Sequence, residues 1–267
     1  MSTPRRNFIK TSLAVSAAAV LPSSALSAAA AATSGKREFY ELRAYRMKTG
    51  ASDASLHTYL EKAFIPACNR QGSANVGVFT ENAPKDGPTV WMLIPHASLN
   101  GLVATQSLIE SDPALKQAGT AYLLTPKATP AFDRIDSWLL HAFTGMPVME
   151  LPSYSKARLP RLFELRMYES YSEVKALKKI AMFNDGEIDV MRDVALAPVF
   201  FGQALTGPNL PHLTYMTSAP DADAHKRHWD AFKVHPTWEK LKNDPLYADT
   251  VSKNTARILS PTAYSQI

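Results

Sequence analysis

Two short rows of polar side chains in this sequence are chemically suited to hold a ligand. In each row a carboxylate, a guanidinium and a phenol alternate with apolar residues: Glu41, Arg43 and Tyr45, and again Glu164, Arg166 and Tyr168. Burying such a row is unfavourable unless its charges pair. Two interpretations follow. The rows form a structural network, or an arginine binds an anionic or carbonyl oxygen while a tyrosine orients the substrate and the glutamate serves as a general base.

Two further residues are candidates for ligand binding because they stand at related positions of the chain. His212 begins a predicted strand, and the residue 123 positions earlier is Thr89. Trp91 stands two residues after Thr89 and so shares its face of the predicted strand. Trp91 and His212 are therefore added to the candidate ligand-binding residues. A haem-ligating or proton-relay histidine at 212 is the functional alternative, and we expect instead a solvated turn histidine.

The sequence gives little support for a metal site or a tightly held cofactor. His225 and His228 are spaced to share a helix face near Asp221, which is a minimal pattern for a divalent metal. Trp229 and Phe232 define the buried stripe of that helix, so we expect both histidines to face solvent. The single cysteine, Cys68, is expected to be a buried structural thiol. No metal and no cofactor is predicted.

The elements that carry these rows repeat along the chain. At one gapless offset of 123 residues, Glu41, Leu42, Arg43 and Tyr45 align with Glu164, Leu165, Arg166 and Tyr168. The same offset aligns Ile65 with Ile188, Val76 with Val199, Pro88 with Pro211, Pro113 with Pro236, and Arg134 with Arg257. We therefore predict two copies of one unit, at 33–142 and 160–267, with a proline-containing linker at 143–159.

Each unit shows the same order of predicted elements. A strand (39–46; 162–168) precedes a helix (52–70; 172–194), a hairpin, a second helix (99–110; 222–234) and a short strand near Ile135 or Ile258. This βαββαβ order predicts the ferredoxin-like pattern within an α+β chain. Two such sheets can cover one another as a dimeric α/β barrel formed within one chain. We expect the apolar rows of the first strands to pack on the helices and the polar rows to point into the barrel.

The first 32 residues have the composition of an export signal. Arg5 and Arg6 precede a short alanine-rich apolar stretch and small residues suited to cleavage, a pattern typical of a bacterial Tat signal. We expect the mature protein in the periplasm, with no membrane segment of its own, and the Tat machinery as a partner of the precursor. Residues 1–32 carry +3 of the formal net charge of +5. The near-neutral remainder gives no footprint for nucleic acid.

Several segments of the second unit resemble the NIPSNAP family. They are "FELRMYES", "VFFGQALTGPNLPHLTYMTSAP", "HWDAFKVHPTWEKLKND" and the ending "ILSPTAYSQI". The first unit, with "FYELRAYRM" and "VWMLIPHASL", resembles the family more weakly. The resemblance implies the dimeric α/β-barrel fold and little about chemistry. If one half carries a site, the second is the expected one.

Three functions remain open on this basis. The first is an exported barrel protein that binds a small organic molecule within the barrel. The second is a cofactor-independent oxygenase or isomerase acting on an activated aromatic or carbonyl compound. The third is a structural module that assembles through exposed hairpin edges, and a homo-oligomer is compatible with each.

Overall fold

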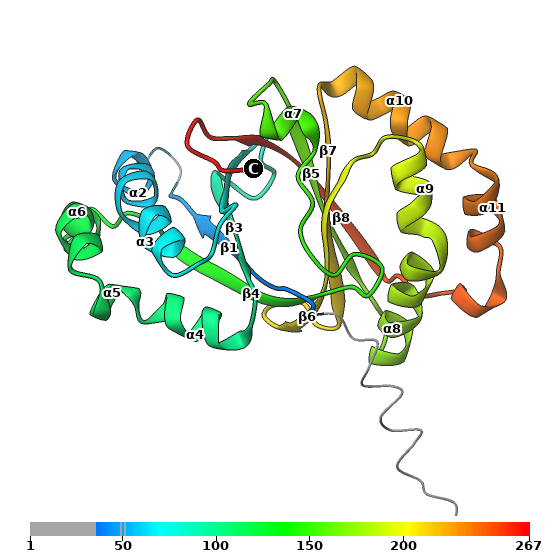
Figure 1. Ribbon diagram of the computed structural model, residues 1–267, viewed down its shortest axis with the longest axis horizontal. Helices are drawn as coiled ribbons and strands as arrows, with labels where there is room; N and C mark the ends of the chain where they lie inside the picture. Colours follow the sequence, from blue (N-terminus) through cyan, green and yellow to red (C-terminus); the bar gives the residue numbers. More distant parts are fainter. Residues whose placement is uncertain (1–35, 49, 51) are drawn as a thin grey trace, which may run out of the picture. The chain divides into compact units, whose positions relative to one another are not determined.

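The computed structural model describes residues 36–48, 50 and 52–267, so the predicted signal segment lies outside the described residues. Its sheet is a closed antiparallel barrel of eight strands in the order β1-β3-β2-β8-β5-β7-β6-β4 (Figure 1). The strands are β1 (Phe39–Arg46), β2 (Gly77–Glu81), β3 (Thr89–His96), β4 (Arg134–Ala142), β5 (Leu162–Glu169), β6 (Pro198–Thr206), β7 (His212–Ala219) and β8 (Lys253–Pro261).

The helices lie outside the barrel in two groups. The group that follows β1 and β3 comprises α2 (Ala54–Tyr59), the π-helical turn η1 (Leu60–Phe64), α3 (Ile65–Arg70), α4 (Leu99–Gln106), α5 (Leu108–Ser111) and α6 (Pro113–Leu123). The group that follows β5 and β7 comprises α8 (Glu173–Met182), the π-helical turn η2 (Phe183–Glu187), α9 (Ile188–Asp193), α10 (Ala222–Lys233), α11 (Pro236–Lys242) and η3 (Pro245–Tyr247). The connection between the groups contains α7 (Ser153–Lys156).

The two halves of the barrel have matching strand orders. The first half, β1 to β4, runs β4-β1-β3-β2, and the second half, β5 to β8, runs β8-β5-β7-β6. The pairing of β1 with β3 places Phe39 opposite His96, and the pairing of β5 with β7 places Leu162 opposite Ala219, at the same offset of 123. The halves join where β2 pairs with β8 and β4 pairs with β6. The predicted mixed α/β barrel is thus confirmed.

The inside of the barrel is filled by apolar side chains. The first strand of each half contributes Tyr40, Leu42 and Ala44, or Phe163 and Leu165, to one continuous core. The other strands add Phe79, Trp91, Leu93, Trp138, Leu140, Ala142, Phe200, Ala204, Met216 and Leu259. An eight-stranded barrel has an interior just wide enough for side chains to fill, so this layer leaves little room for a buried ion pair.

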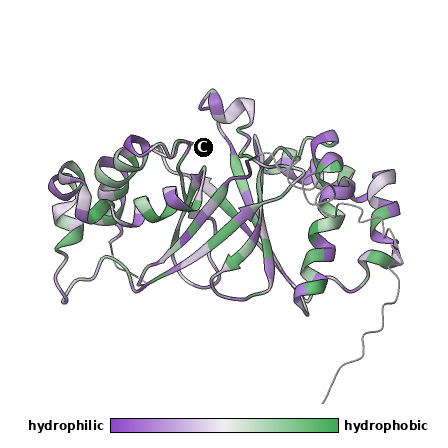
Figure 2. Ribbon diagram, turned by 60° about the horizontal axis from the view of Figure 1, so that its bottom comes forward, coloured by the Kyte–Doolittle hydropathy of each residue, from purple (hydrophilic) through white to green (hydrophobic). Residues whose placement is uncertain are grey.

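The prediction that the polar rows point into the barrel is therefore wrong. Tyr45 and Tyr168 pack in the cores between the sheet and its helices, not in the barrel core. The polar residues of each row do share one face of their strand, as predicted. Both faces of each strand are buried, however, so periodicity alone does not distinguish the inner face from the outer one. Figure 2 shows hydrophobic and hydrophilic positions side by side along the barrel strands.

Packing between sheet and helices completes the fold. Cys68 is a buried free thiol in the core between the sheet and the helices of the first half, as predicted. Within the part of the chain that the structure describes, none of the helices combines the length and the apolar character needed to cross a bilayer.

Candidate functional site

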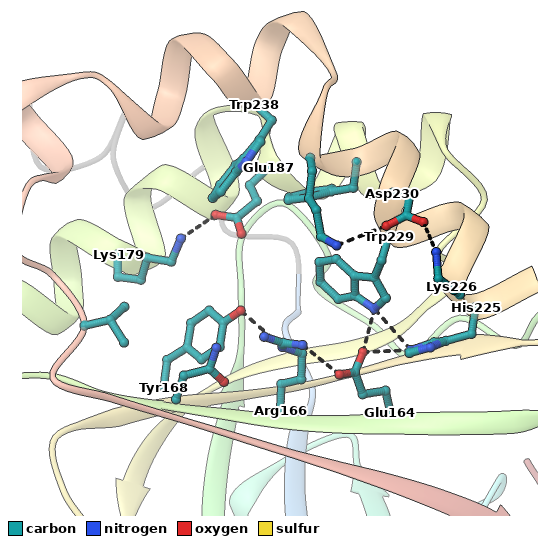
Figure 3. Close-up of a pocket in the computed structure, with 14 residues that line it drawn as sticks. Glu164, Arg166, Tyr168, Lys179, Glu187, His225, Lys226, Trp229, Asp230 and Trp238 are labelled. Carbon is teal, nitrogen blue, oxygen red and sulfur yellow. Dashed lines mark hydrogen bonds and ion pairs between the residues drawn. The ribbon is translucent and has the colours of Figure 1, made fainter. Parts of the chain in front are cut away.

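A cavity in the second half lies between the outer face of the sheet and the helices α8, α10 and α11 (Figure 3). Its volume is about 660 Å³, within the range of small-molecule sites. We call it the α8–α10 cavity. It is lined by Glu164, Arg166, Tyr168, Lys179, Glu187, His225, Lys226, Trp229, Asp230, Phe232, Lys233, Trp238, Val251 and Asn254.

Local sequence signals place the side chains of this cavity. The strand period of two puts Glu164, Arg166 and Tyr168 on the helix-facing side of β5. Helix α10 is capped by Asp221, whose side chain accepts a hydrogen bond from the backbone N–H of Ala224. His225 and Trp229 then follow one turn apart on the face that meets β5.

A network of hydrogen bonds links these strand and helix residues. Arg166 Nη1 donates to Glu164 Oε1 at 2.7 Å, and Arg166 Nε donates to the hydroxyl of Tyr168 at 3.2 Å. The other oxygen of Glu164 accepts from His225 Nε2 at 2.9 Å and from the indole N–H of Trp229 at 2.7 Å. The Arg166 guanidinium lies 4.7 Å from the Trp229 ring centroid. Its Nη2 makes no hydrogen bond to any residue described by the structure, so a donor remains for a ligand.

The electrostatic setting keeps this network charged. Burial alone would raise the pKa of Glu164, but the hydrogen bond from His225 and the charge of Arg166 outweigh it and hold that pKa below its ordinary value. Burial of the phenols raises the pKa of both Tyr168 and Tyr215, whose hydroxyls lie 2.9 Å apart. The site therefore presents a carboxylate, a guanidinium and neutral phenols near pH 7.

A second buried pair in the cavity was missed by the sequence analysis. Lys179 on α8 donates from Nζ to Glu187 Oε2 at 2.6 Å, at the end of η2. Their side chains are only 5% and 2% exposed. The signal that could have found them is the offset of 123, which aligns this charged pair with the apolar Leu56 and Phe64.

In the first half, the equivalent polar row forms a closed network. Arg43 binds Glu41 through Nε at 2.6 Å and Nη2 at 3.0 Å, and Nη1 lies 3.4 Å from the hydroxyl of Tyr45. Gln106 donates to both oxygens of Glu41, and Arg43 lies over the ring of Phe64. The neighbouring cavity is smaller, about 360 Å³. The structural interpretation thus fits this half, and the larger of the two cavities belongs to the second.

The other two candidates lie apart from the α8–α10 cavity. Trp91 faces the barrel interior, where it stacks on Trp138 with ring centroids 5.9 Å apart and donates to Glu81. His212 is 1% exposed and contacts Thr214, so the expectation of a solvated turn histidine is wrong. Burial lowers the pKa of its imidazole. It stands at the start of β7, directly after the exposed turn that joins β6 to β7.

The expected solvated face of α10 is also corrected in part. His225 faces the cavity with a side chain 17% exposed, because Glu164 supplies a hydrogen-bonding partner. His228 is not among the residues that line it. Across residues 36–48, 50 and 52–267, no group of three or more His, Cys, Asp or Glu side chains is arranged to hold a metal ion.

Comparison with solved structures supports the fold. The chain is similar to a "putative monooxygenase" from Fusobacterium nucleatum subsp. nucleatum, with a TM-score of 0.55, 9% identity, and coverage of 84% of this chain and 92% of that chain. It is similar to a "putative monooxygenase" from Lactobacillus acidophilus NCFM, with a TM-score of 0.55, 8% identity, and coverage of 84% and 94%. At these identities the likeness is one of fold alone.

A family model matches the second half of the chain. A NIPSNAP family protein from Agrobacterium tumefaciens str. C58 covers 40% of this chain and 91% of its own length, with 16% identity and a TM-score of 0.37. No curated protein matched the chain. The NIPSNAP family model matches residues 163–266, which include β5, the α8–α10 cavity and β8. The part of the chain that matches this family model therefore forms the second half of the eight-stranded α/β barrel.

Proposed function

We propose that this protein binds a small organic molecule in the α8–α10 cavity. The observation that carries the proposal is the unpaired Nη2 donor of Arg166 at a cavity of about 660 Å³, while each guanidinium nitrogen of Arg43 in the first half makes a hydrogen bond. The location differs from the earlier expectation of a ligand inside the barrel, because the barrel interior is packed.

The lining indicates the class of ligand. A guanidinium with a free planar edge suits a carboxylate or a polarised carbonyl oxygen. The indoles of Trp229 and Trp238 supply apolar surface for a flat ring, and both line the cavity with Phe232. A ligand that combines an aromatic or unsaturated body with one acidic or carbonyl group therefore fits the charges and surfaces of the site.

A catalytic alternative is a cofactor-independent oxygenase or isomerase acting on an activated aromatic or carbonyl compound. The contact between His225 and Glu164, 2.9 Å apart at the cavity wall, favours it, because an imidazole oriented by a carboxylate can accept a proton from a bound substrate. The two proteins described as "putative monooxygenase" share the fold with this chain. A shared fold does not by itself imply a shared reaction.

The first experiment is native mass spectrometry with an absorption spectrum on protein recovered from its producing cell. A bound small molecule that is lost in Arg166→Ala and kept in Arg43→Ala supports the proposal. A clean apo mass, together with no binding of an aromatic carboxylate such as 4-methylbenzoate at millimolar concentration, contradicts it.

We also propose that the chain consists of two tandem ferredoxin-like units, at 33–142 and 160–267, behind a cleaved export signal. The matching strand orders and the offset of 123 support the two units. Arg5 and Arg6 support Tat export to the periplasm. The double variant Arg5→Lys, Arg6→Lys should retain the precursor in the cytoplasm, and cell fractionation checks this. Unchanged export of the double variant would exclude the Tat route.

A further inference from the structure

The amine of Lys179 forms part of the wall of the α8–α10 cavity (Figure 3). The residue is only 4% exposed, so a molecule reaches it through the cavity. Three aromatic rings surround its Nζ, with centroids at 4.7 Å for Phe183, 5.4 Å for Trp238 and 5.7 Å for Tyr168. A lysine amine that opens onto a ligand cavity is a group that proteins use to form imines with carbonyl substrates.

A carboxyl group stands beside this amine. Glu187 Oε2 lies 2.6 Å from Nζ, and Glu187 is 2% exposed. Burial raises the pKa of Glu187, and the charge of Lys179 offsets only part of that effect. The short contact gives a direct path for a proton, and a proton that passes along it from the ammonium to the carboxylate leaves a neutral amine beside a carboxylic acid.

The fold itself does not require this charged pair. In the first half the same helical positions hold Leu56, which is fully buried, and Phe64, and both pack in an apolar core. The π-helical turns η1 and η2 coincide at the offset of 123, and such turns are frequent at functional sites. In η2, Gly186 has a φ of +149°, a backbone conformation that other residues rarely adopt, directly before Glu187.

We propose that Lys179 forms an imine with an aldehyde or ketone bound in the α8–α10 cavity, and that Glu187 transfers the protons of this reaction. The inference rests on the proposed function, since it concerns the same cavity. Arg166 supplies the second point of attachment: its guanidinium carbon lies 5.5 Å from the Tyr168 ring that Lys179 also contacts. The ligand class is thus an oxo or aldehyde acid with a flat apolar body.

The proton balance of the step closes within the pair. The neutral amine attacks the carbonyl carbon, a C–N bond forms, and the carbonyl oxygen takes the proton of the Glu187 carboxylic acid. The nitrogen then returns one proton to the Glu187 carboxylate. In the second stage that proton passes to the hydroxyl group, the C–O bond breaks and water leaves.

The products of this step suit the site. They are an iminium cation and the Glu187 carboxylate, so the ion pair that started the reaction is restored and no oxidant or reductant is needed. The aromatic rings that surround Lys179 Nζ stabilise a cation at the same place. An iminium group also acidifies a C–H bond on the adjacent carbon, which links this inference to the isomerase alternative.

The experiment is reductive trapping on the full chain. The probe is 4-carboxybenzaldehyde with sodium cyanoborohydride at pH 7, and peptide mapping gives the labelling rate of each lysine. We expect Lys179 to be labelled at least tenfold faster than Lys178, its neighbour on α8, which does not line the cavity. Arg166→Ala should remove that advantage.

Two variants control for folding. Lys179→Arg keeps a cation beside Glu187 but cannot form an imine, so the fast label should disappear. Should this variant not fold, the double variant Lys179→Leu, Glu187→Phe installs the residues that the first half carries at these positions. The fast label should likewise disappear in it, while Lys178 keeps its slow rate.

A parallel titration with 4-methylbenzoate, which has no carbonyl group able to condense, separates the two proposals. Binding of 4-methylbenzoate that needs Arg166, without faster labelling of Lys179 than of Lys178, overturns the imine inference and leaves the proposed function standing. No binding of either probe and no fast label overturn both. Fast, Arg166-dependent labelling of Lys179 supports both.

Discussion

At the scale of single residues, the same three side chains have different surroundings in the two halves. Glu41 accepts hydrogen bonds from Arg43 and Gln106, and each guanidinium nitrogen of Arg43 makes a hydrogen bond. The cavity beside Arg43 is also smaller than the α8–α10 cavity. Glu164 is held by His225 and Trp229, and these contacts free one edge of Arg166. The difference arises from the residues that α10 and α4 place over the sheet.

Removal of Arg166 should abolish ligand binding while the protein stays folded. Glu164 keeps two donors in Arg166→Ala, so we expect a stability loss of about 1–3 kcal/mol, below that of a fully orphaned buried charge. Urea unfolding and a binding titration measure the two effects. The matched variant Arg43→Ala should lose similar stability and keep ligand binding. Equal loss of binding in both variants would place the ligand elsewhere.

The pKa of Glu164 predicts part of the acid sensitivity of the fold. Because that pKa is lowered on folding, the Glu164 carboxylate stabilises the protein above its unfolded pKa of about 4.3, and the contribution is lost as pH falls through the folded value. Glu164→Gln should therefore flatten the decline of unfolding free energy as the pH falls below about 4.3. Denaturant titrations at several pH values test this. Parallel curves for both proteins would contradict it.

At the scale of elements, α8 with η2 carries a charged pair where α2 with η1 carries apolar side chains. The replacement of Leu56 and Phe64 by Lys179 and Glu187 gives one helix a polar wall, while a π-helical turn stands at the same position in both halves. Helix α10 contributes the opposite wall, and its N-cap at Asp221 fixes the position at which His225 and Trp229 reach β5.

A mutant cycle should show that the buried pair is not needed for stability. Lys179→Leu leaves Glu187 buried without its partner and should lose about 3–5 kcal/mol. The double variant Lys179→Leu, Glu187→Phe should match or exceed the wild type by up to about 4 kcal/mol, since apolar packing replaces two desolvated charges. Thermal and urea unfolding measure both. A double variant as unstable as the single one would mean that the pair stabilises the fold.

At the scale of the whole barrel, each half covers the apolar face of the other. Phe163, Leu165 and Leu259 of the second half meet Tyr40, Leu42 and Phe79 of the first in one core. The two halves also pair at two seams, β2 with β8 and β4 with β6, so neither half has an exposed sheet edge at these places. The second half without its partner half would expose this face to water.

The isolated segment 160–267 should therefore not behave as a monomer. Its open apolar face should drive it to pair with a second copy or to aggregate, whereas the chain from residue 33 onward needs no such partner to close its barrel. Size-exclusion chromatography with light scattering distinguishes these states. A stable, soluble monomer of 160–267 would show that the first half is not required to cover the barrel core.

The sequence by itself determined the elements and their order. Strand alternation, the offset of 123 and the turn residues are local signals, and β1 begins and ends where they placed it. They also placed Glu164, Arg166 and Tyr168 on one face, because residues two apart on a strand always share a face. The export signal and the division into units remain predictions from the sequence.

Only the tertiary structure decided which face is inside and what meets it. Both faces of β1 and β5 are buried, one in the barrel and one under helices. The hydropathy of their residues therefore does not distinguish the face that points into the barrel from the face that points outward. The contacts of Glu164 with His225 and Trp229 span more than 60 positions of the chain and depend on where α10 packs. The Lys179 amine became a candidate for chemistry only when packing placed it at a cavity wall beside Glu187.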